Sequence, residues 1–389
     1  LIIKKKIKKC LSTSDQTSLM IPVNKFTLNK SDARAVYNSI NNNWISSAGP
    51  HVKKFEKKFA QIIDKKYCSS VSSGTAALEI ALKTINLKKG DQVIIPNFTI
   101  ISNAMAVIKQ NATPVPVDCD LTTWNMKIDE LEQKITKKTK AIIATHIYGY
   151  PIEIDLIKKI CLKKKLYLIE DAAEMLGHKY KGKYCGYYGD ISTFSLYANK
   201  HVTTGEGGLI LTNNKKFYNK FNDYRNLCFG KKNRFNHEEI AWNYRFTNIQ
   251  ASLGLNQLGR LKSIILKKKK IGKLYYKYLK DNPHIFIQKP KLNKLENIYW
   301  VVGILINKKK MLSDNFKKKL KKNKIESRSF FWPMHRQSAI KRLGFKFKES
   351  FKNSDYISKY GLYLPSGLAT TPKDIKYVCK CINIITKKF

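Results

Sequence analysis

Residues 141–171 read AIIATHIYGYPIEIDLIKKICLKKKLYLIED, and the fold can be worked out from this stretch. Two short apolar runs, residues 141–149 and 166–171, stand on either side of a helix-like segment at 153–165. Continuous apolar strands of this kind are buried on both faces, as in parallel sheets covered by helices. The stretch therefore predicts a strand, a crossover helix and a second, parallel strand.

The same alternation extends on both sides of this unit. Further strand-like runs are residues 92–96, 113–118, 190–197 and 207–212. Further helix-like segments are residues 31–42, 50–64, 69–85 and 127–135, and the third of these opens with a glycine-bearing turn. We expect an α/β fold, with a three-layer αβα large domain built on a mainly parallel sheet over residues 20–260.

The pattern changes after about residue 245. A long helix-like stretch at 246–281 is followed by a strand-like run at 299–306, a Lys-rich helix at 309–322 and a final helix at 372–387. We expect these segments to form a smaller C-terminal α+β domain over residues 261–389. Residues 1–19 are basic and lack the apolar core of a secretory signal, so we expect a flexible extension there.

The 389 residues include 74 Lys or Arg and 28 Asp or Glu, which gives a formal net charge of +46. The Lys excess is spread along the chain, and no nucleic-acid-binding module accompanies it. We therefore interpret it as solvated surface and expect no nucleic-acid partner, although an anionic substrate would associate faster with such a surface. No run of about 18 apolar residues occurs, so we expect no membrane span.

Eight cysteines are scattered through the chain without a disulfide framework. Only Cys379 and Cys381 are close in sequence, and their spacing offers no metal cage. We expect no metal site, and we expect a reducing, cytoplasmic location.

Two segments carry groups suited to binding an anionic heteroaromatic cofactor. Ser73, Gly74 and Thr75 stand at a probable helix start, where backbone N–H groups can approach a phosphate. Asp171 and Glu174 follow the apolar run 166–171, at the strand end where α/β proteins bind ligands. A carboxylate there can pair with a protonated ring nitrogen, but Asp171 could equally be a helix N-cap.

Two later segments add a nucleophile and a polar cluster. Lys200 stands among Asn199, His201 and nearby threonines and glycines. A lysine held close to apolar strands can lose its proton and act as a nucleophile and then as a base. Ser195, five residues earlier, is within reach of a phosphate. Asn243 belongs to an Asn-Tyr-Arg cluster before an apolar helix, which indicates either an interface or a helix cap.

Taken in order, these segments resemble the DegT-type sugar aminotransferases, which are pyridoxal-phosphate enzymes of the aspartate-aminotransferase fold (fold type I). The resemblance runs from about Met20 to the C-terminus. The strings that carry it are NNWISSAGPHVKKFE, DLTTWNM, HIYGYP, IEDAAEMLG, NKHVTTGEGG, NYRFTNIQASLGLNQL, IESRSFFWPMH and GLYLPSG.

The resemblance implies a role for each candidate residue. Lys200 matches the lysine that binds pyridoxal phosphate covalently and later moves a proton, and Asp171 matches the carboxylate that keeps the pyridine nitrogen protonated. Glu174 matches a polar group beside the ring. Gly74, Thr75 and Ser195 match phosphate contacts.

The resemblance also extends to the partner and the substrate. Asn243 matches a phosphate contact supplied by the neighbouring subunit, which implies a homodimer with shared active sites. His335 and Arg328 are candidates for the sugar-nucleotide side. Ile100 stands where many relatives place an aromatic ring over the cofactor, so stacking of about 1 kcal/mol would be missing here.

The implied reaction is transamination at C4 of a nucleotide-linked 4-keto-6-deoxyhexose, with L-glutamate as amino donor, and a GDP-linked sugar is favoured. A UDP- or dTDP-linked 4-keto-6-deoxyglucose is the alternative substrate. A related 3-dehydratase would place His where Lys200 stands. An alternative of another class is an inactive, basic binding protein, against which the intact set of Lys200, Asp171, Ser195 and Thr75 argues.

Overall fold

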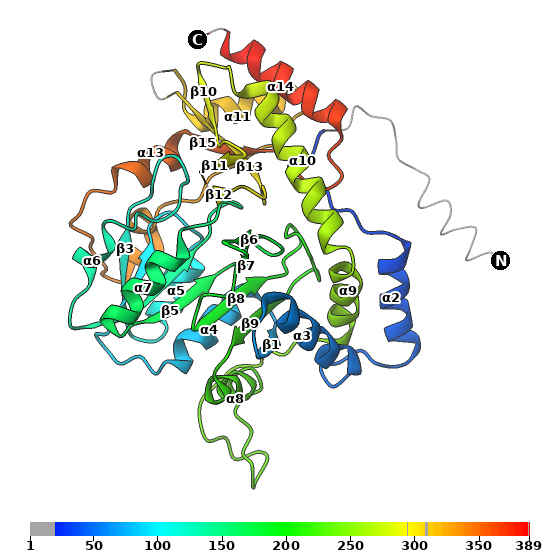
Figure 1. Ribbon diagram of the computed structural model, residues 1–389, viewed down its shortest axis with the longest axis vertical. Coiled ribbons are helices and arrows are strands. Elements are labelled where there is room, and N and C mark those ends of the chain that lie inside the picture. Colours follow the sequence, from blue (N-terminus) through cyan, green and yellow to red (C-terminus); the bar gives the residue numbers. More distant parts are fainter. Residues whose placement is uncertain (1–19, 294, 308–309, 388) are drawn as a thin grey trace, which may run out of the picture.

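The computed structural model describes residues 20–293, 295–307, 310–387 and 389. The expectation for residues 1–19 lies outside this described part. In the described residues, a seven-stranded sheet covered by helices forms the larger of two structural units. The C-terminal helices and strands form a second unit, which lies above that sheet in Figure 1.

The large sheet has the strand order β1-β9-β8-β5-β4-β2-β3. Its strands are β1 (Tyr67–Val71), β2 (Gln92–Pro96), β3 (Thr113–Val117), β4 (Thr139–Thr145), β5 (Tyr167–Asp171), β8 (Ile191–Ser195) and β9 (Gly208–Thr212). Pairs β3–β2, β2–β4, β4–β5 and β5–β8 are parallel, whereas β9 runs antiparallel to both β8 and β1. The prediction of a mainly parallel sheet is confirmed. The reversal of β9 was not predicted, because its apolar run resembles those of the parallel strands.

Helices cover both faces of this sheet, as a three-layer arrangement requires. Side chains alternate across β4, so that Ile142 packs in the apolar core on one face and Ile143 in the core on the other. The first core includes helices α3 (Pro50–Ile63), α7 (Ile154–Lys164) and α9 (Asn248–Leu258). The second includes α4 (Gly74–Thr84), α5 (Ser102–Ile108) and α8 (Lys215–Tyr224).

The C-terminal unit is built on a four-stranded antiparallel sheet with the order β10-β13-β15-β14. Its strands are β10 (Ile285–Ile287), β13 (Val302–Ile306), β14 (Arg328–Ser329) and β15 (Gly361–Leu364). Helices α10 (Leu261–Leu279), α11 (Ser313–Lys322) and α14 (Pro372–Thr386) share their apolar core with this sheet. Near the start of the described chain, Ile21 forms a bridge with Ile325 of this unit.

Shorter elements connect these layers. They are α2 (Lys30–Asn41), which packs on α9, and α6 (Leu131–Lys134), α12 (Ser338–Arg342), α13 (Lys352–Tyr360), the 3-10 turn η1 (Met334–Arg336), and strands β6 (Lys179–Tyr180), β7 (Lys183–Tyr184), β11 (Lys291–Leu292) and β12 (Leu295–Glu296).

Two predicted helices differ from the structure. The stretch 246–281 forms two helices, α9 and α10, because the backbone of Arg260 leaves the helical conformation. Its guanidinium lies 2.5 Å from a carboxylate oxygen of the buried Asp32, a contact that ties the junction of the two helices to α2. The segment 127–135 contains only the four-residue α6, where Leu131 is the one buried side chain.

The described helices include none that is both long enough and apolar enough to cross a membrane.

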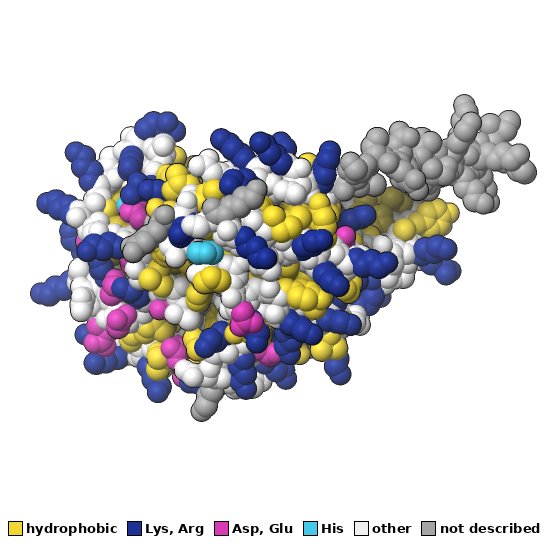
Figure 2. Space-filling view, turned by 90° about the horizontal axis from the view of Figure 1, so that it is seen from above, with side chains coloured by type: hydrophobic (Ala, Val, Ile, Leu, Met, Phe, Trp, Pro, Cys, Tyr) yellow, Lys and Arg dark blue, Asp and Glu magenta, His cyan; other side chains and the backbone are white. Residues whose placement is uncertain are grey.

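Lys and Arg side chains are distributed over the face shown in Figure 2, where Asp and Glu are fewer. The cysteines within the described chain are free thiols in buried positions. On the face in Figure 2 the basic side chains are spread broadly and do not gather in one patch.

Candidate active site

A cavity of about 310 Å³ lies where the carboxyl ends of several parallel strands meet. Residues that end or follow β2, β4, β5 and β8 line it, together with the first turn of α4. Trp300, Phe331 and Tyr363 close it from the C-terminal unit. The position agrees with the rule that open α/β sheets bind ligands beyond the carboxyl ends of their strands.

The first turn of α4 forms one end of the cavity. Ser73 caps this helix, because its hydroxyl accepts a hydrogen bond from the N–H of Ala76 at 3.1 Å. Gly74 follows, and a Cβ at this position would lie 2.9 Å from the Cβ of Ser195. Only glycine therefore lets the helix start approach β8 so closely. The hydroxyls of Thr75 and Ser102 lie 2.8 Å apart beside this turn. Free N–H groups, hydroxyls and the helix dipole together suit a phosphate.

Asp171 forms another wall of the cavity, at the end of β5. It is buried, and its Oδ1 accepts a hydrogen bond from the N–H of Ala173 at 3.1 Å. Turns rather than a helix follow it, so the N-cap interpretation is wrong. Burial raises the pKa of Asp171, while the charge of Lys200 opposes this rise. A buried carboxylate that forms no ion pair with any described residue is suited to a cationic ligand.

Lys200 and Glu174 lie together on the remaining side. The Nζ of Lys200 is 3.8 Å from Oε1 of Glu174, and only 11% of the Lys200 side chain is exposed. Burial lowers the pKa of Lys200, and the charges of Glu174 and Asp171 oppose this. Burial also raises the pKa of Glu174. The other carboxylate oxygen of Glu174 accepts a hydrogen bond from the N–H of Tyr148 at 2.6 Å, which fixes its orientation.

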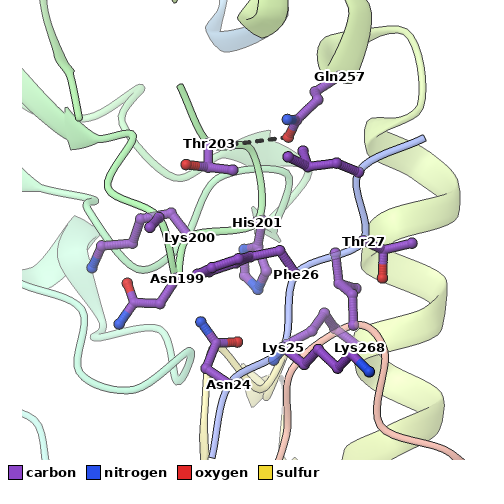
Figure 3. Close-up of a pocket in the computed structure, with 13 residues that line it drawn as sticks. Asn24, Lys25, Phe26, Thr27, Asn199, Lys200, His201, Thr203, Gln257 and Lys268 are labelled. Carbon is purple, nitrogen blue, oxygen red and sulfur yellow. Dashed lines mark hydrogen bonds between the residues drawn. The ribbon is translucent and has the colours of Figure 1, made fainter. Parts of the chain in front are cut away.

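A second, much smaller cavity of about 20 Å³ lies behind the loop that carries Lys200. Figure 3 shows that His201 points into it, beside Phe26, whereas the amine of Lys200 points away. The N–H of Thr203 donates to Oε1 of Gln257 at 3.0 Å, and this bond ties the loop to α9. The small cavity therefore belongs to the support of the loop, and the amine of Lys200 serves the larger one.

The six residues to which the resemblance gives a role at the cofactor within one chain line the larger cavity: Gly74, Thr75, Asp171, Glu174, Ser195 and Lys200. Ile100 also lines it and is 45% exposed, so an aliphatic side chain occupies the position discussed above for an aromatic ring. Asn243 is exposed, lies outside the lining of this cavity, and forms an isolated bridge with Asn226.

The two candidates for the sugar-nucleotide side lie farther away. His335 is not part of the lining; its Nδ1 is 2.9 Å from the side-chain nitrogen of Asn97, and its Nε2 is 3.1 Å from Asp355. It thereby holds the segment of Phe331 against the end of β2. Arg328 is largely exposed and interacts with the hydroxyl of Tyr363, which does line the cavity.

Sequence reasoning missed two residues that shape the cavity. The indole of Trp300 lies against the amine of Lys200, and the phenol oxygen of Tyr148 accepts a hydrogen bond from the N–H of Phe331 at 3.0 Å. Trp300 lies in the run 299–306, which was interpreted only as a strand. Tyr148 lies in the string HIYGYP, which was interpreted only as a sign of the family. Their aromatic side chains next to strand ends were the available signal.

The cavity fits pyridoxal phosphate by the chemistry of its walls. A buried carboxylate without an ion-pair partner in the described chain suits the protonated ring nitrogen, and a helix N-terminus with hydroxyls suits the phosphate. An amine with a lowered pKa suits covalent attachment to the aldehyde. The hydroxyl of Thr193, buried and without a hydrogen-bond partner, also lines the cavity and is available to a ligand. Fold and site thus define the class of pyridoxal-phosphate-dependent enzymes.

Comparison with known proteins narrows this class. Residues 27–383 match the model of the DegT/DnrJ/EryC1/StrS aminotransferase family. The chain therefore belongs to this family and is a pyridoxal-phosphate-dependent sugar aminotransferase.

Similar proteins include two GDP-perosamine synthases. That of Escherichia coli O157:H7 is 36% identical over 93% of this chain and 98% of its own length. That of Vibrio cholerae is 34% identical over 94% of this chain and 98% of its own length. Among solved structures, the putative sugar aminotransferase Spr1654 of Streptococcus pneumoniae in its PMP form superimposes with a TM-score of 0.88 at 25% identity, over 95% of this chain and 98% of its own.

Proposed function

We propose that this protein transfers the amino group of L-glutamate to C4 of a GDP-linked 4-keto-6-deoxyhexose and so makes a 4-amino-4,6-dideoxy sugar. The observation that carries the proposal is that the amine of Lys200 shares one cavity with Asp171 and the first turn of α4. The similarity to two GDP-perosamine synthases over nearly the whole chain supports the choice of sugar. A histidine in place of Lys200 would instead have favoured the 3-dehydratase chemistry.

Each residue of the cavity then has a definite task. Pyridoxal phosphate, when bound, supplies the electron sink that makes the α-carbon of glutamate acidic. Lys200 attaches the cofactor and, once released, carries the proton to and from the reacting carbon. Asp171 keeps the proton on the ring nitrogen, because a buried carboxylate strongly favours a cationic neighbour. Gly74, Thr75 and Ser195 bind the phosphate.

Glu174 has a different task, beside the ring. Its orientation is fixed by the N–H of Tyr148, and its other oxygen faces Lys200 at 3.8 Å. From there it can hold a proton close to the amine. Such a group helps the amine to exchange its proton between the two halves of the reaction.

The homodimer is part of the proposal. Asn243 is exposed and outside the cavity of its own chain, as a residue that contacts the neighbouring subunit's cofactor must be. The homodimer with shared active sites rests on this placement and on the resemblance of the NYRFTNIQ segment to the family.

The sugar nucleotide would enter past Ile100 and Tyr197, which line the cavity and are each 45% exposed, and meet Tyr363 on the side of the C-terminal unit. Arg328 interacts with Tyr363 there, and its guanidinium, 3.8 Å from Glu326, belongs to a side chain that is 54% exposed. A guanidinium in this place can pair with a diphosphate. His335 would contribute only indirectly, through the position of Phe331. The positive surface of the protein would increase the rate at which an anionic substrate associates.

A substrate comparison tests the proposal. Purified protein is loaded with pyridoxal phosphate and L-glutamate and then offered GDP-4-keto-6-deoxymannose, UDP-4-keto-6-deoxyglucose or dTDP-4-keto-6-deoxyglucose, with product mass and cofactor absorbance as readouts. Amination of the GDP sugar alone supports the proposal. Amination of a UDP or dTDP sugar instead would replace the substrate and keep the residue roles. No spectral response to glutamate would overturn the proposed half-reaction.

A further inference from the structure

Trp300 lies directly against the amine of Lys200. The Nζ of Lys200 is 3.8 Å from the centroid of the indole, and Trp300 is buried. The indole N–H donates a hydrogen bond to the carbonyl oxygen of Asn199 at 3.0 Å. Since Asn199 precedes Lys200, the ring is fastened to the same loop that carries the amine.

The backbone of Trp300 is held just as firmly from the other side. Its carbonyl oxygen accepts a hydrogen bond from Nζ of Lys268, on α10, at 2.8 Å. The same amine donates to the carbonyl oxygen of Ser366 at 2.5 Å. Lys268 is buried, its burial lowers its pKa to about 7, and it forms no ion pair with a described acidic residue. A buried amine between two carbonyls acts mainly to fix both of them.

The backbone next to Trp300 is strained in this arrangement. Tyr299 has a φ of +55°, which an L-residue rarely adopts. The N–H of Ile298 donates to the carbonyl oxygen of Gly149 at 2.9 Å, and a Cβ on Gly149 would lie 2.5 Å from the nitrogen of Trp300. The two segments are therefore pressed together backbone to backbone, which leaves the indole little freedom to move.

We propose that Trp300 holds the amine of Lys200 against its ring whenever that amine is released from the cofactor, and that Lys268 is the positioning residue that keeps Trp300 there. The inference rests on the proposed role of Lys200. Transamination frees this amine when glutamate binds, and the amine, whose side chain is only 11% exposed, then needs a defined place in the cavity. An aromatic face attracts a cation without forming an ion pair, so the amine is held but can leave.

Two carboxylates face the amine together with the ring. Glu174 lies 3.8 Å away, and the charge of Asp171 also acts on Lys200. Both favour the protonated amine, as the indole does. Substitution of Trp300 leaves these carboxylates in place, so a change in the pKa of Lys200 reports the contribution of the ring.

The test uses the cofactor-loaded enzyme, with and without excess L-glutamate. Competitive acetylation with acetic anhydride, followed by mass spectrometry of the peptide that contains Lys200, gives the fraction of free amine and its pKa. Trp300→Leu is expected to lower this pKa by about one unit and Trp300→Phe by less, since the cation loses part or all of an aromatic face. Lys268→Met, which cannot donate, is expected to lower it as well.

Trp332→Leu is the matched control, because Trp332 is 52% exposed and lies outside the cavity lining. It should leave the pKa of Lys200 unchanged. If Trp300→Leu does not fold, a lower value in Trp300→Phe supports the inference and an unchanged one overturns it. Equal pKa values in the wild-type enzyme and both Trp300 variants overturn the inference and leave the proposed function intact. If glutamate does not expose Lys200 of the wild-type enzyme to acetylation, the proposed function itself is wrong.

Discussion

The amine of Lys200 and the carboxylate of Glu174 face each other at 3.8 Å, and only 11% and 6% of their side chains are exposed. Burial disfavours the charge on each of them, since it lowers the pKa of Lys200 and raises the pKa of Glu174. Each charge in turn favours the other. The two groups therefore titrate as a pair, and removal of one changes the proton affinity of its partner.

Glu174→Gln should lower the pKa of Lys200 by about one unit, because the amine loses its nearest negative charge while the amide oxygen can still accept from the N–H of Tyr148. The fraction of pyridoxal phosphate that binds covalently falls as pH decreases, and this fall (the acid limb) should move to lower pH. Absorbance in a series of buffers measures it. Glu132→Gln is the control, since this side chain is half exposed and far along the chain on α6. A limb that stays in place or moves to higher pH would contradict the pairing.

Lys200→Ala should reduce turnover by at least about 10³-fold, because the attachment point and the proton carrier are lost together. The phosphate and ring contacts remain, so the variant should still bind pyridoxal phosphate, without the absorbance of the covalent form. Lys138→Ala, at an exposed position, should behave like the wild-type enzyme in both measurements. Turnover of Lys200→Ala near the wild-type rate would remove Lys200 from the mechanism.

Asp171→Asn should have opposite effects on activity and on stability. Turnover should fall about 10²-fold or more, since the amide does not hold a proton on the ring nitrogen. The cofactor-free protein should melt roughly 2 °C higher at pH 7, because burial raises the pKa of Asp171 and its charge therefore costs folding free energy above the pKa of the unfolded chain. Calorimetry and rate measurements, with the exposed Asp129→Asn as control, check both. A lower melting temperature would show that the charge is satisfied within the protein.

Ile100→Phe should bind pyridoxal phosphate about five-fold more tightly, because an aromatic side chain at the edge of the cavity adds stacking of about 1 kcal/mol. Equilibrium titration of the cofactor-free protein measures this. Ile240→Phe tests for a general effect of added aromatic surface, since Ile240 is 94% exposed. Weaker binding by Ile100→Phe would mean that Ile100 does not face the ring.

Gly149→Ala and Gly90→Ala form a matched pair for backbone packing. Both glycines have left-handed backbones, with φ values of +92° and +86°, but only Gly149 has atoms within contact distance of an added Cβ. Gly90→Ala should cost about 1 kcal/mol of unfolding free energy, and Gly149→Ala about 3 kcal/mol or more. Urea denaturation measures both. Equal losses would indicate that the segment of Trp300 can move aside.

Much of the fold follows from local sequence pattern. The strands around residues 141–171 and the helix start at Ser73 and Gly74 were predicted because apolar runs and a serine-glycine turn are signals within a few residues. The reversed direction of β9 depends on where the chain returns to the sheet, which no local signal shows. The break at Arg260 coincides with an ion pair to Asp32, more than two hundred residues away, and no pattern within the stretch 246–281 reveals that partner.

The same distinction applies to the site. Lys200 stood out because its flanks are unlike those of the other lysines, and Asp171 because it ends an apolar strand. The contact between Lys200 and Trp300 joins residues one hundred positions apart, and only packing of the C-terminal unit on the large sheet creates it. The partners of His335, Asn97 and Asp355, also come from distant segments, and these contacts keep it outside the lining of the cavity; its part on the sugar-nucleotide side stays a prediction.

The close approach of the backbone at Gly74 to the side chain of Ser195 determines which positions of this enzyme can be varied in a redesign. A side chain at Gly74 would collide with β8, so a library that varies this floor of the cavity would consist mostly of inactive members. Ile100 and Tyr197, at its rim, are each 45% exposed and can be exchanged without moving the backbone. Directed evolution toward other sugar nucleotides should therefore randomise the rim and leave the floor as it is.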